Sequence, residues 1–401
     1  MEKESDYVLL QSQTIDWLRF PLAVAVVFIH SFGYPLTYTL PALNIHSFSG
    51  MDVYNVIRIC FSHVAAHVAV PTFFLISGFL FFVGKVNEIE KLAWWKRKFR
   101  SRLNTLVFPY FLWNLIAILC TVSMMIGSFF LKGKPLSRIF DYFEENRWLH
   151  LFWDCEIWGE NRLNWLGVAM PSTAPANVPL WFLRDLLVVV AVTPVIFWLV
   201  KRLKYFYIFV LAFCYVSKIW FVIPGVSITA IFFFSLGAFF SIHGKNLVKE
   251  IKKIKFLSFA LGILLLLITV LCDGNNTSTG FLIYPFFVIV GVCATFNLAI
   301  FLLESGKVKV YPILSKSSFF IYATHTLLIL SVSRAVCSRI LYWNTPLVLT
   351  IRYFATPILA VGACFTLYIV MKKFTPKLLD VLTGNRSVSY THLTLPTNSR
   401  V

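Results

Sequence analysis

The sequence predicts an all-α fold, a polytopic membrane bundle of about ten transmembrane helices with both termini in the cytoplasm. Hydrophobic residues make up 58% of the 401 residues, and the mean hydropathy is +0.77. Both values lie far from those of a soluble domain. The apolar residues also gather into long runs, and the basic residues gather between these runs. Together these observations predict one membrane domain over residues 1–386.

Ten apolar stretches divide this domain. Most of them are long enough to cross a hydrocarbon core of about 30 Å, which takes roughly 20 helical residues. The fifth, sixth and seventh stretches are shorter or interrupted. The ten cover residues 15–33, 54–84, 105–131, 179–200, 205–223, 227–242, 256–272, 280–303, 313–334 and 347–371.

Basic side chains between the stretches predict the orientation. Lysine and arginine cluster after the second, fourth, sixth, eighth and tenth stretches, whereas the loops 34–53 and 273–279 contain neither. Cytoplasmic loops carry the excess of basic residues, so both termini are predicted to be cytoplasmic. These clusters account for the formal charge of +18. We therefore expect a lipid bilayer, and no nucleic acid, as the partner of this charge.

The last residues, 387–401, are predicted to be a translated sequencing adaptor. Val388 to Thr397 back-translate, codon by codon, into a sequence that resembles a transposase-based library adaptor. We expect the natural reading frame to break off near residue 386. His392 is therefore not counted among candidate functional residues.

Two costly side chains lie in the first apolar stretch. Arg19 and His30 are eleven positions apart, so on one helix they point within roughly 20° of each other and lie roughly 16 Å apart along the axis. Such groups are costly in a membrane unless they face a protein interior or a water-filled cavity. The pair is therefore a catalytic candidate, with Arg19 toward the cytoplasm. The spacing equally fits an Arg19 that snorkels beside Asp16 and a structural His30.

Three further histidines lie in apolar stretches. His63 and His67 are four residues apart, a spacing that can bind zinc, but the glutamate of His-Glu-x-x-His is missing and no third ligand is evident. We expect no metal there, and one of the two can lie close to His30. His325 falls in the middle of the ninth stretch, where an ionisable residue is a functional candidate by default. A hydrogen-bonded structural role fits His325 equally well.

A basic run precedes the third stretch and contains Arg97, Arg100 and Arg102. Topogenic charge and attraction to anionic lipid would explain it. A binding site for phosphates would explain it equally, because arginine contacts phosphate in a bidentate manner.

The long outer loop, 132–178, is rich in tryptophan and carboxylates. This composition suits either a sugar-binding surface or an aromatic belt at the membrane interface. At the start of the fourth stretch, Arg184 and Asp185 are adjacent and do not share a helix face, so we expect each to find a partner elsewhere. Gly78 is expected to serve close helix packing.

Taken in order, these segments resemble the acyltransferase 3 family of integral membrane proteins. The resemblance spans residues 13–375. It is carried by Asp16-x-x-Arg19 with His30, Phe73-Phe-Leu-Ile-Ser-Gly-Phe-Leu80, Arg97-x-x-Arg100 before Pro109-Tyr110, Trp181-Phe182-Leu183, and Tyr322-x-x-His325.

The resemblance implies an O-acyltransferase that moves an acyl group, commonly acetyl, from acetyl-CoA or another acyl-CoA to a hydroxyl group of a surface or exported glycan. It implies that Arg19 and His30 are the essential pair, with His30 as general base or transient acyl carrier. It also implies that Arg97 and Arg100, with Arg102 beside them, bind the cytoplasmic donor. His325 remains a catalytic candidate from its place in the membrane.

The expected location is a bacterial inner membrane, crossed several times. The acceptor can be a glycan or a lipid-linked sugar, and the sequence leaves the oligomeric state open. An alternative function is a non-enzymatic transporter or flippase of a lipid-linked glycan, which would use intramembrane charge but would need no acyl-CoA site. A structural scaffold is disfavoured by the number of buried ionisable residues.

Overall fold

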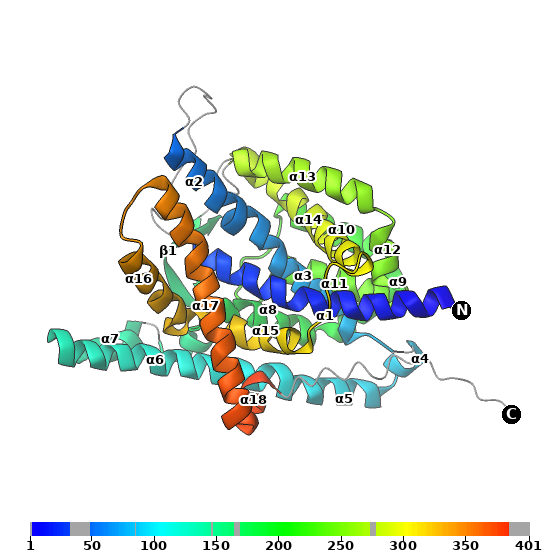
Figure 1. Ribbon diagram of the computed structural model, residues 1–401. Coiled ribbons are helices and arrows are strands. Elements are labelled where there is room, and N and C mark those ends of the chain that lie inside the picture. The colour runs from blue at the N-terminus through cyan, green and yellow to red at the C-terminus, as the bar shows by residue number, and fades with distance from the viewer. Residues whose placement is uncertain are drawn as a thin grey trace.

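The computed structural model describes residues 2–32, 49–84, 86–145, 147–163, 169–272 and 278–384, and these are almost entirely helical (Figure 1). The predicted adaptor, 387–401, lies outside these residues. The helices are α1 Glu2–His30, α2 Gly50–Arg58, α3 Ala69–Phe81, α4 Val86–Ile89, α5 Leu92–Arg102, α6 Phe108–Lys132, α7 Ser137–Glu145, α8 Trp181–Ala191, α9 Thr193–Leu203, α10 Tyr205–Ser217, α11 Ile228–Ile242, α12 Leu247–Lys252, α13 Lys255–Leu271, α14 Ser278–Glu304, α15 Pro312–Thr324, α16 Leu330–Ile340, α17 Pro346–Phe374 and α18 Pro376–Thr383.

Within the described ranges, six helical segments are long and apolar enough to cross a membrane. A seventh consists of α8 and α9, which are bent by 65° relative to each other, and α10, α11 and α13 are shorter apolar helices. The prediction of a helical, multi-span membrane protein is confirmed. The count of about ten spans and the cytoplasmic termini stay predictions.

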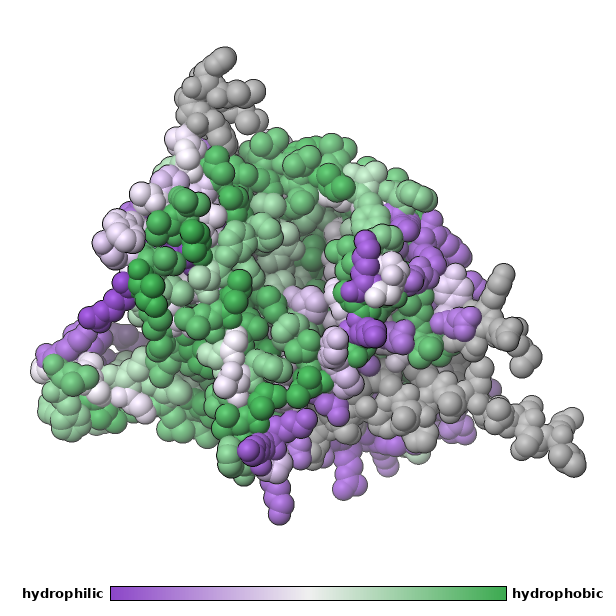
Figure 2. Space-filling model, in the orientation of Figure 1, coloured by the Kyte–Doolittle hydropathy of each residue, from purple (hydrophilic) through white to green (hydrophobic). Residues whose placement is uncertain are grey.

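The two ends of the bundle differ in polarity. The start of α1 lies at the same end as α4, α5 and α12, and α7, α16 and β1 lie at the opposite end (Figure 1). Hydrophilic side chains gather at the first of these ends, while the helices that face the viewer between the two ends are largely apolar (Figure 2). This arrangement suits a bundle whose sides face lipid and whose ends face water.

Helix boundaries follow local chemistry. The Thr345 hydroxyl caps α17 by accepting a hydrogen bond from the Val348 amide, and Pro346 fills the first helical position, where its missing N–H costs nothing. At the end of α6, Gly133 adopts the left-handed conformation, with φ +63°, which glycine reaches without steric cost.

Two glycines let α3 and α11 pack in direct backbone contact. A Cβ atom on Gly78 would lie 1.9 Å from the Phe234 carbonyl oxygen, and a Cβ atom on Gly237 would lie 1.9 Å from the Leu75 carbonyl oxygen. Small residues at such crossings allow close approach in membrane bundles. The packing role expected for Gly78 is therefore confirmed. This contact fixes the wall from which Ser77 projects.

The described residues of the long loop 132–178 include a short antiparallel hairpin. Its strands are β1 Cys155–Leu163 and β2 Ala169–Ala174. The Tyr110 hydroxyl donates to the Phe152 carbonyl, which ties the loop to α6. Trp153 packs against Gly225, whereas Trp148 is exposed. The side chains of Trp158, Glu160, Arg162 and Trp165 lie outside the described part, so the sugar-surface hypothesis stays a prediction.

Two membrane-spanning segments depart from regular α-helix near their middle. The segment Gly50–Phe81 contains a π turn, Ile59–Val64, and a 3-10 turn, Ala65–Val68. The segment Pro312–Ile340 is broken at His325–Ile329, where Leu328 adopts a φ of +67°. A left-handed leucine costs energy that the surrounding structure must offset, and such irregularities are frequent at functional sites.

Candidate active site

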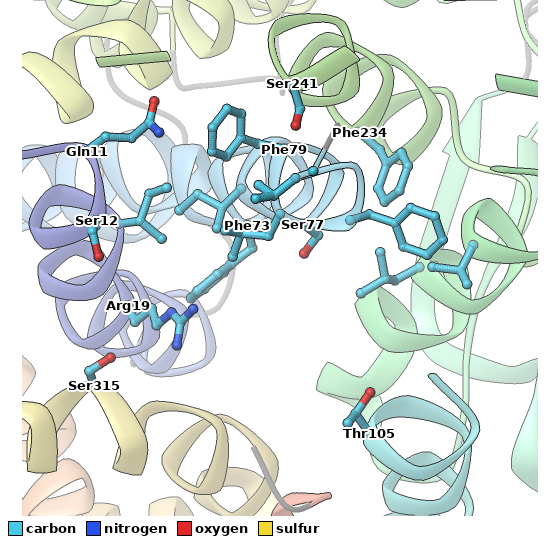
Figure 3. A pocket seen from close by; sticks show the side chains of 18 of the residues that line it. Gln11, Ser12, Arg19, Phe73, Ser77, Phe79, Thr105, Phe234, Ser241 and Ser315 are labelled. Atoms are coloured by element: carbon cyan, nitrogen blue, oxygen red, sulfur yellow. The ribbon is translucent and has the colours of Figure 1, made fainter. Parts of the chain in front are cut away.

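A cavity of about 1070 Å³ opens among α1, α3, α5, α8, α11 and α15. In Figure 3, Arg19 projects from α1 toward the open centre, and Phe73, Ser77 and Thr105 border the same space. Ligand pockets commonly measure about 300–1,000 Å³. This cavity therefore suits a long ligand better than a single sugar ring.

The lining of this cavity, here called the donor cavity, is strongly basic. One carboxylate in its lining, Glu250, already contacts Lys253 at 2.8 Å. Clustered positive charge beside low-dielectric walls attracts anions such as phosphates. The six cations that line the cavity are Arg19, Lys98, Arg102, Lys245, Lys249 and Lys316.

Two elements hold most of these cations in place. On α5, Lys98 and Arg102 are four residues apart and share one helix face, and both lie within 6 Å of the Phe81 ring centroid. The α12 segment is fastened to α1 because Gln11 accepts a hydrogen bond from the Leu247 amide at 2.7 Å. That bond fixes the position of α12, which carries Lys249, and of the loop before it, which carries Lys245.

Helices α1 and α15 run side by side in the same direction. Arg19 and Ser315 line the donor cavity together near one end. At the other end, the imidazole rings of His30 and His325 lie 5.2 Å apart. The lining continues along α15 as far as Tyr322, one helical turn before His325. The donor cavity therefore leads toward the histidine pair.

The tautomer of His325 follows from its hydrogen bonds. Its Nδ1 lies 2.9 Å from the Tyr322 carbonyl and 3.2 Å from the Ile321 carbonyl. Carbonyl oxygens only accept, so Nδ1 carries the proton and Nε2 of the neutral ring keeps a free lone pair. Nε2 is buried and has no hydrogen-bond partner in the described part of the chain. It is therefore available as a base or an acceptor.

His63 and His67 extend this group. The His63 ring stacks on Phe32 with centroids 3.8 Å apart, and the turn that carries His67 packs against α1, the helix of His30. His63, His67 and His325 all lie in the irregular turns of their segments. Among the described residues, no group of three or more metal-ligating side chains is arranged to hold a metal.

An asparagine holds the broken segment next to His325. The Asn177 side chain donates to the Ala323 carbonyl at 3.0 Å and accepts from the Thr326 hydroxyl at 3.2 Å. Its backbone N–H donates to the Asn114 side chain at 3.0 Å. These bonds satisfy polar groups that an unbroken helix would have paired internally. They connect three elements at the break.

The predicted catalytic residues come together in part. His30 and His325 are neighbours, and Arg19 lines the donor cavity, where it also contacts Asp16 at 3.6 Å. Arg19 is the last residue of α1 in the cavity lining, so it lies on the histidine side of the other α1 lining residues.

The predicted donor-binding arginines are divided by the geometry of α5. Arg102 lines the donor cavity, whereas Arg97 and Arg100 are exposed and do not. Sequence reasoning missed Lys98, which shares the Arg102 face. It also missed Lys245 and Lys249, because their charge was interpreted as topogenic, and it missed Lys316 of α15. The sequence did carry a signal for these lysines. Basic loops that lie on the same side of a membrane are expected at the same end of the helix bundle, where their side chains can line one cavity.

One expectation about ion pairing was wrong in part: the two adjacent residues Arg184 and Asp185 pair with each other, although Arg184 also finds the expected partner elsewhere. Arg184 and Asp185 are both buried and pair with each other, with Nε and Oδ1 3.0 Å apart. Arg184 also donates to the Trp153 carbonyl at 2.8 Å. Adjacent residues project in different directions from a helix, but the long, flexible arginine side chain can turn back to its neighbour. The pair anchors the outer hairpin and does not line the donor cavity.

Comparisons with known proteins agree with this geometry. A family model described as an acyltransferase domain matches residues 12–370. The chain is 23% identical over 346 residues to the succinoglycan biosynthesis protein ExoH of Rhizobium meliloti (strain 1021), a match that covers 82% of each chain. No solved structure matches. Because the match covers most of the described bundle, the chain belongs to the acyltransferase 3 family, and it is a multi-pass membrane acyltransferase.

Proposed function

We propose that this protein transfers an acyl group, acetyl in the simplest case, from acyl-CoA to a hydroxyl group of a glycan. The observation that supports the proposal is that the lining of the basic donor cavity comes within one helical turn of the histidine pair along α15. The cavity lining ends at Tyr322, one turn from His325, and the His325 ring lies 5.2 Å from His30. Acyl-CoA has the matching polarity, with phosphates at one end and a thioester at the other.

The donor binds through its phosphates at the basic end. Lys98 and Arg102 contact them from α5, Lys249 contacts them from α12, and Lys245 contacts them from the loop before α12. Arginine and lysine together can bind several phosphate groups of one ligand. Arg19 then holds the chain of the donor at the deep end of the cavity, and the thioester reaches the histidine pair.

The chemical step moves the acyl group from the thioester sulfur of the donor to the hydroxyl oxygen of the acceptor. In this proposal Nε2 of His325 accepts a hydrogen bond from the His30 ring, and the second nitrogen of His30 takes the proton of the acceptor hydroxyl. The hydroxyl oxygen attacks the thioester carbon, the new C–O bond forms and the C–S bond breaks. The departing CoA thiolate takes the proton from His30. A transient acyl-His30 would consume the same substrates in two steps.

The glycan acceptor and the orientation complete the proposal. The related ExoH is a succinoglycan biosynthesis protein, which supports a carbohydrate acceptor. The convergence of basic loops at the end that contains α5 and α12 supports a cytoplasmic donor. The acceptor, a glycan or a lipid-linked sugar, then reaches His30 from the opposite end. The membrane is the inner membrane of a bacterium.

The experiment is a transfer assay in membranes that contain the wild type, His30→Ala or His243→Ala. Radiolabelled acetyl-CoA is supplied with the surface glycan of a strain that lacks this protein. We measure labelled glycan and free CoA thiol. His243 lies at the end of α11, outside the histidine pair, so its variant is the matched control. Wild type and His243→Ala should label the glycan, and His30→Ala should not.

Two results would contradict the proposal. Equal labelling by wild type and His30→Ala would show that His30 is not the base. Uptake or export of a lipid-linked glycan without any release of CoA thiol would support the transporter alternative instead. Label that stays on the wild-type protein after acid quenching, and disappears when glycan is added, would distinguish an acyl-His30 from direct transfer.

A further inference from the structure

A second, smaller cavity of about 450 Å³ lies beside α1, between that helix and the connection from α14 to α15. Trp17 and Phe20 of α1 and Leu314 of α15 give it an apolar wall. Lys307 and Lys309 line it from the connecting loop. A cavity with apolar walls and two cations suits an amphipathic ligand.

The charge of this small cavity is positive once local pairs are considered. Glu304, just before the loop, contacts Lys252 at 2.5 Å. Asp16, which lines the cavity, contacts Arg19 at 3.6 Å. Both nearby carboxylates therefore already face a cation, and the two loop lysines supply the remaining charge.

The polar wall of the small cavity is already paired within the protein. Asp16 Oδ1 lies 3.6 Å from Arg19 Nη1, and the Asp16 carboxylate also interacts with the Ser315 side chain. Both residues line the small cavity. Buried polar atoms are costly unless they are paired. The charge that remains for a ligand is therefore that of the two loop lysines.

The place of the small cavity in the bundle favours a lipid. It lies where the spanning helix α14 ends, at Glu304, and α15 begins, at Pro312. Trp17 and Tyr311 in its lining are residue types that prefer the membrane interface. Basic pockets between spanning helices on the cytoplasmic side suit lipid headgroups.

We propose that this cavity binds the headgroup of an anionic phospholipid of the phosphatidylglycerol class. Lys307 and Lys309 contact the phosphate, and the rest of the headgroup lies between these lysines and α1. The acyl chains leave along Trp17 and Phe20. Ser315 lines both cavities, and the Asp16–Arg19 pair joins one to the other. The lipid therefore lies against the wall that carries Arg19, but in a space separate from the donor.

The test measures bound lipid and needs no transfer activity. The full chain is placed in nanodiscs of phosphatidylcholine with phosphatidylglycerol as the minor component. Native mass spectrometry then counts the phosphatidylglycerol that stays bound after mild detergent washing. The double variant Lys307→Gln/Lys309→Gln should bind this lipid about thirty-fold more weakly, because each basic residue near the surface contributes on the order of 1 kcal/mol.

Two further variants separate a built site from surface charge. Lys372→Gln/Lys373→Gln removes the same charge at the end of α17, outside both cavities, and should keep the lipid. Val308→Trp fills the small cavity but keeps both loop lysines, and should lose the lipid. Native-like elution on gel filtration confirms that each variant is folded.

Three outcomes would overturn the proposal. If the Val308→Trp variant still binds phosphatidylglycerol, the lipid lies on the loop surface and not in the cavity. Equal loss from both double variants would mean that general surface charge binds the lipid. Displacement of the lipid from wild type by acyl-CoA, at concentrations that saturate the donor cavity, would mean that the two ligands share one site.

Discussion

The two ends of the α1–α15 pair differ in almost every physical respect. Near Arg19 and Ser315 the two helices border the open donor cavity, which six cations line. Near His30 and His325 the helices are close, the His325 ring is fully buried, and α15 ends in a broken turn. The first end resembles a binding site for a charged ligand. The second resembles a site where a histidine side chain accepts and releases a proton.

This difference has a kinetic consequence. Charges in an open, partly hydrated cavity act mainly on the affinity for the donor, because they contact it equally before and during the reaction. A buried base acts on the chemical step, because it gains a proton only in the transition state. We therefore expect substitutions at the basic end to change KM and substitutions at the histidine end to change kcat.

The largest expected effect is that of His325→Asn. The asparagine amide can still donate toward the Tyr322 carbonyl, but the variant lacks the Nε2 atom that accepts the hydrogen bond from His30 and supports His30 as the base. We expect kcat to fall about 10²- to 10⁴-fold, the range for loss of acid–base catalysis, with KM for acyl-CoA unchanged. Steady-state release of CoA thiol measures both constants. A variant with normal kcat would make His325 a structural residue and would leave His30 alone at this end.

The next effect concerns the wall behind the basic end. Gly78→Ala would push a methyl group into the Phe234 carbonyl, and overpacking of this kind costs typically about 1–3 kcal/mol. We expect less folded protein in detergent and a lower thermal midpoint. Gly127→Ala is the control, because a Cβ at Gly127 meets nothing within 4 Å. Equal midpoints for the two variants would contradict direct contact of the α3 and α11 backbones.

A smaller effect separates the two faces of α5. Arg102→Gln should raise KM for acyl-CoA about tenfold, in line with the loss of one charge-assisted hydrogen bond of about 1.5 kcal/mol. Arg97→Gln removes the same charge from the exposed face and should leave KM nearly unchanged. Titration of donor concentration in the transfer assay checks both. The reverse result would return the donor role to the Arg97 and Arg100 pair.

The sequence predicted which costly residues lie inside the bundle better than it predicted which of them meet. Hydropathy and the cost of buried charge identified Arg19, His30 and His325, and the packing role of Gly78 followed from its apolar surroundings. The direction in which each side chain points from its helix, the helix phase, decided which residues meet. Arg97 and Arg102 belong to one basic run but point to different sides of α5. Phase depends on where a helix begins and on its neighbours, and the sequence does not fix either closely.

Contacts set by distant parts of the fold could not be predicted from the sequence, because they depend on how those parts pack. The pairing of Arg184 with Asp185 depends on the arginine rotamer, which is set by the outer hairpin through the Trp153 carbonyl. The contacts of Asn177 are with Asn114 and Ala323, which are distant in the chain. An ordinary asparagine in a polar stretch carries no signal that it will support a helix break.

The smallest expected effect is that of Asn177→Ala, which separates shape from chemistry at the histidine end. The variant loses the donor to Ala323 and the acceptor for Thr326, two hydrogen bonds worth about 0.5–1.5 kcal/mol each. If these bonds hold the break that orients His325, kcat should fall several-fold while KM for the donor stays constant. The same substitution made together with His325→Asn should cost little more than His325→Asn alone, because an absent imidazole needs no orientation. Additive losses in the double variant would show that Asn177 stabilises the bundle in general, and that the broken turn and the buried base are independent features of this end.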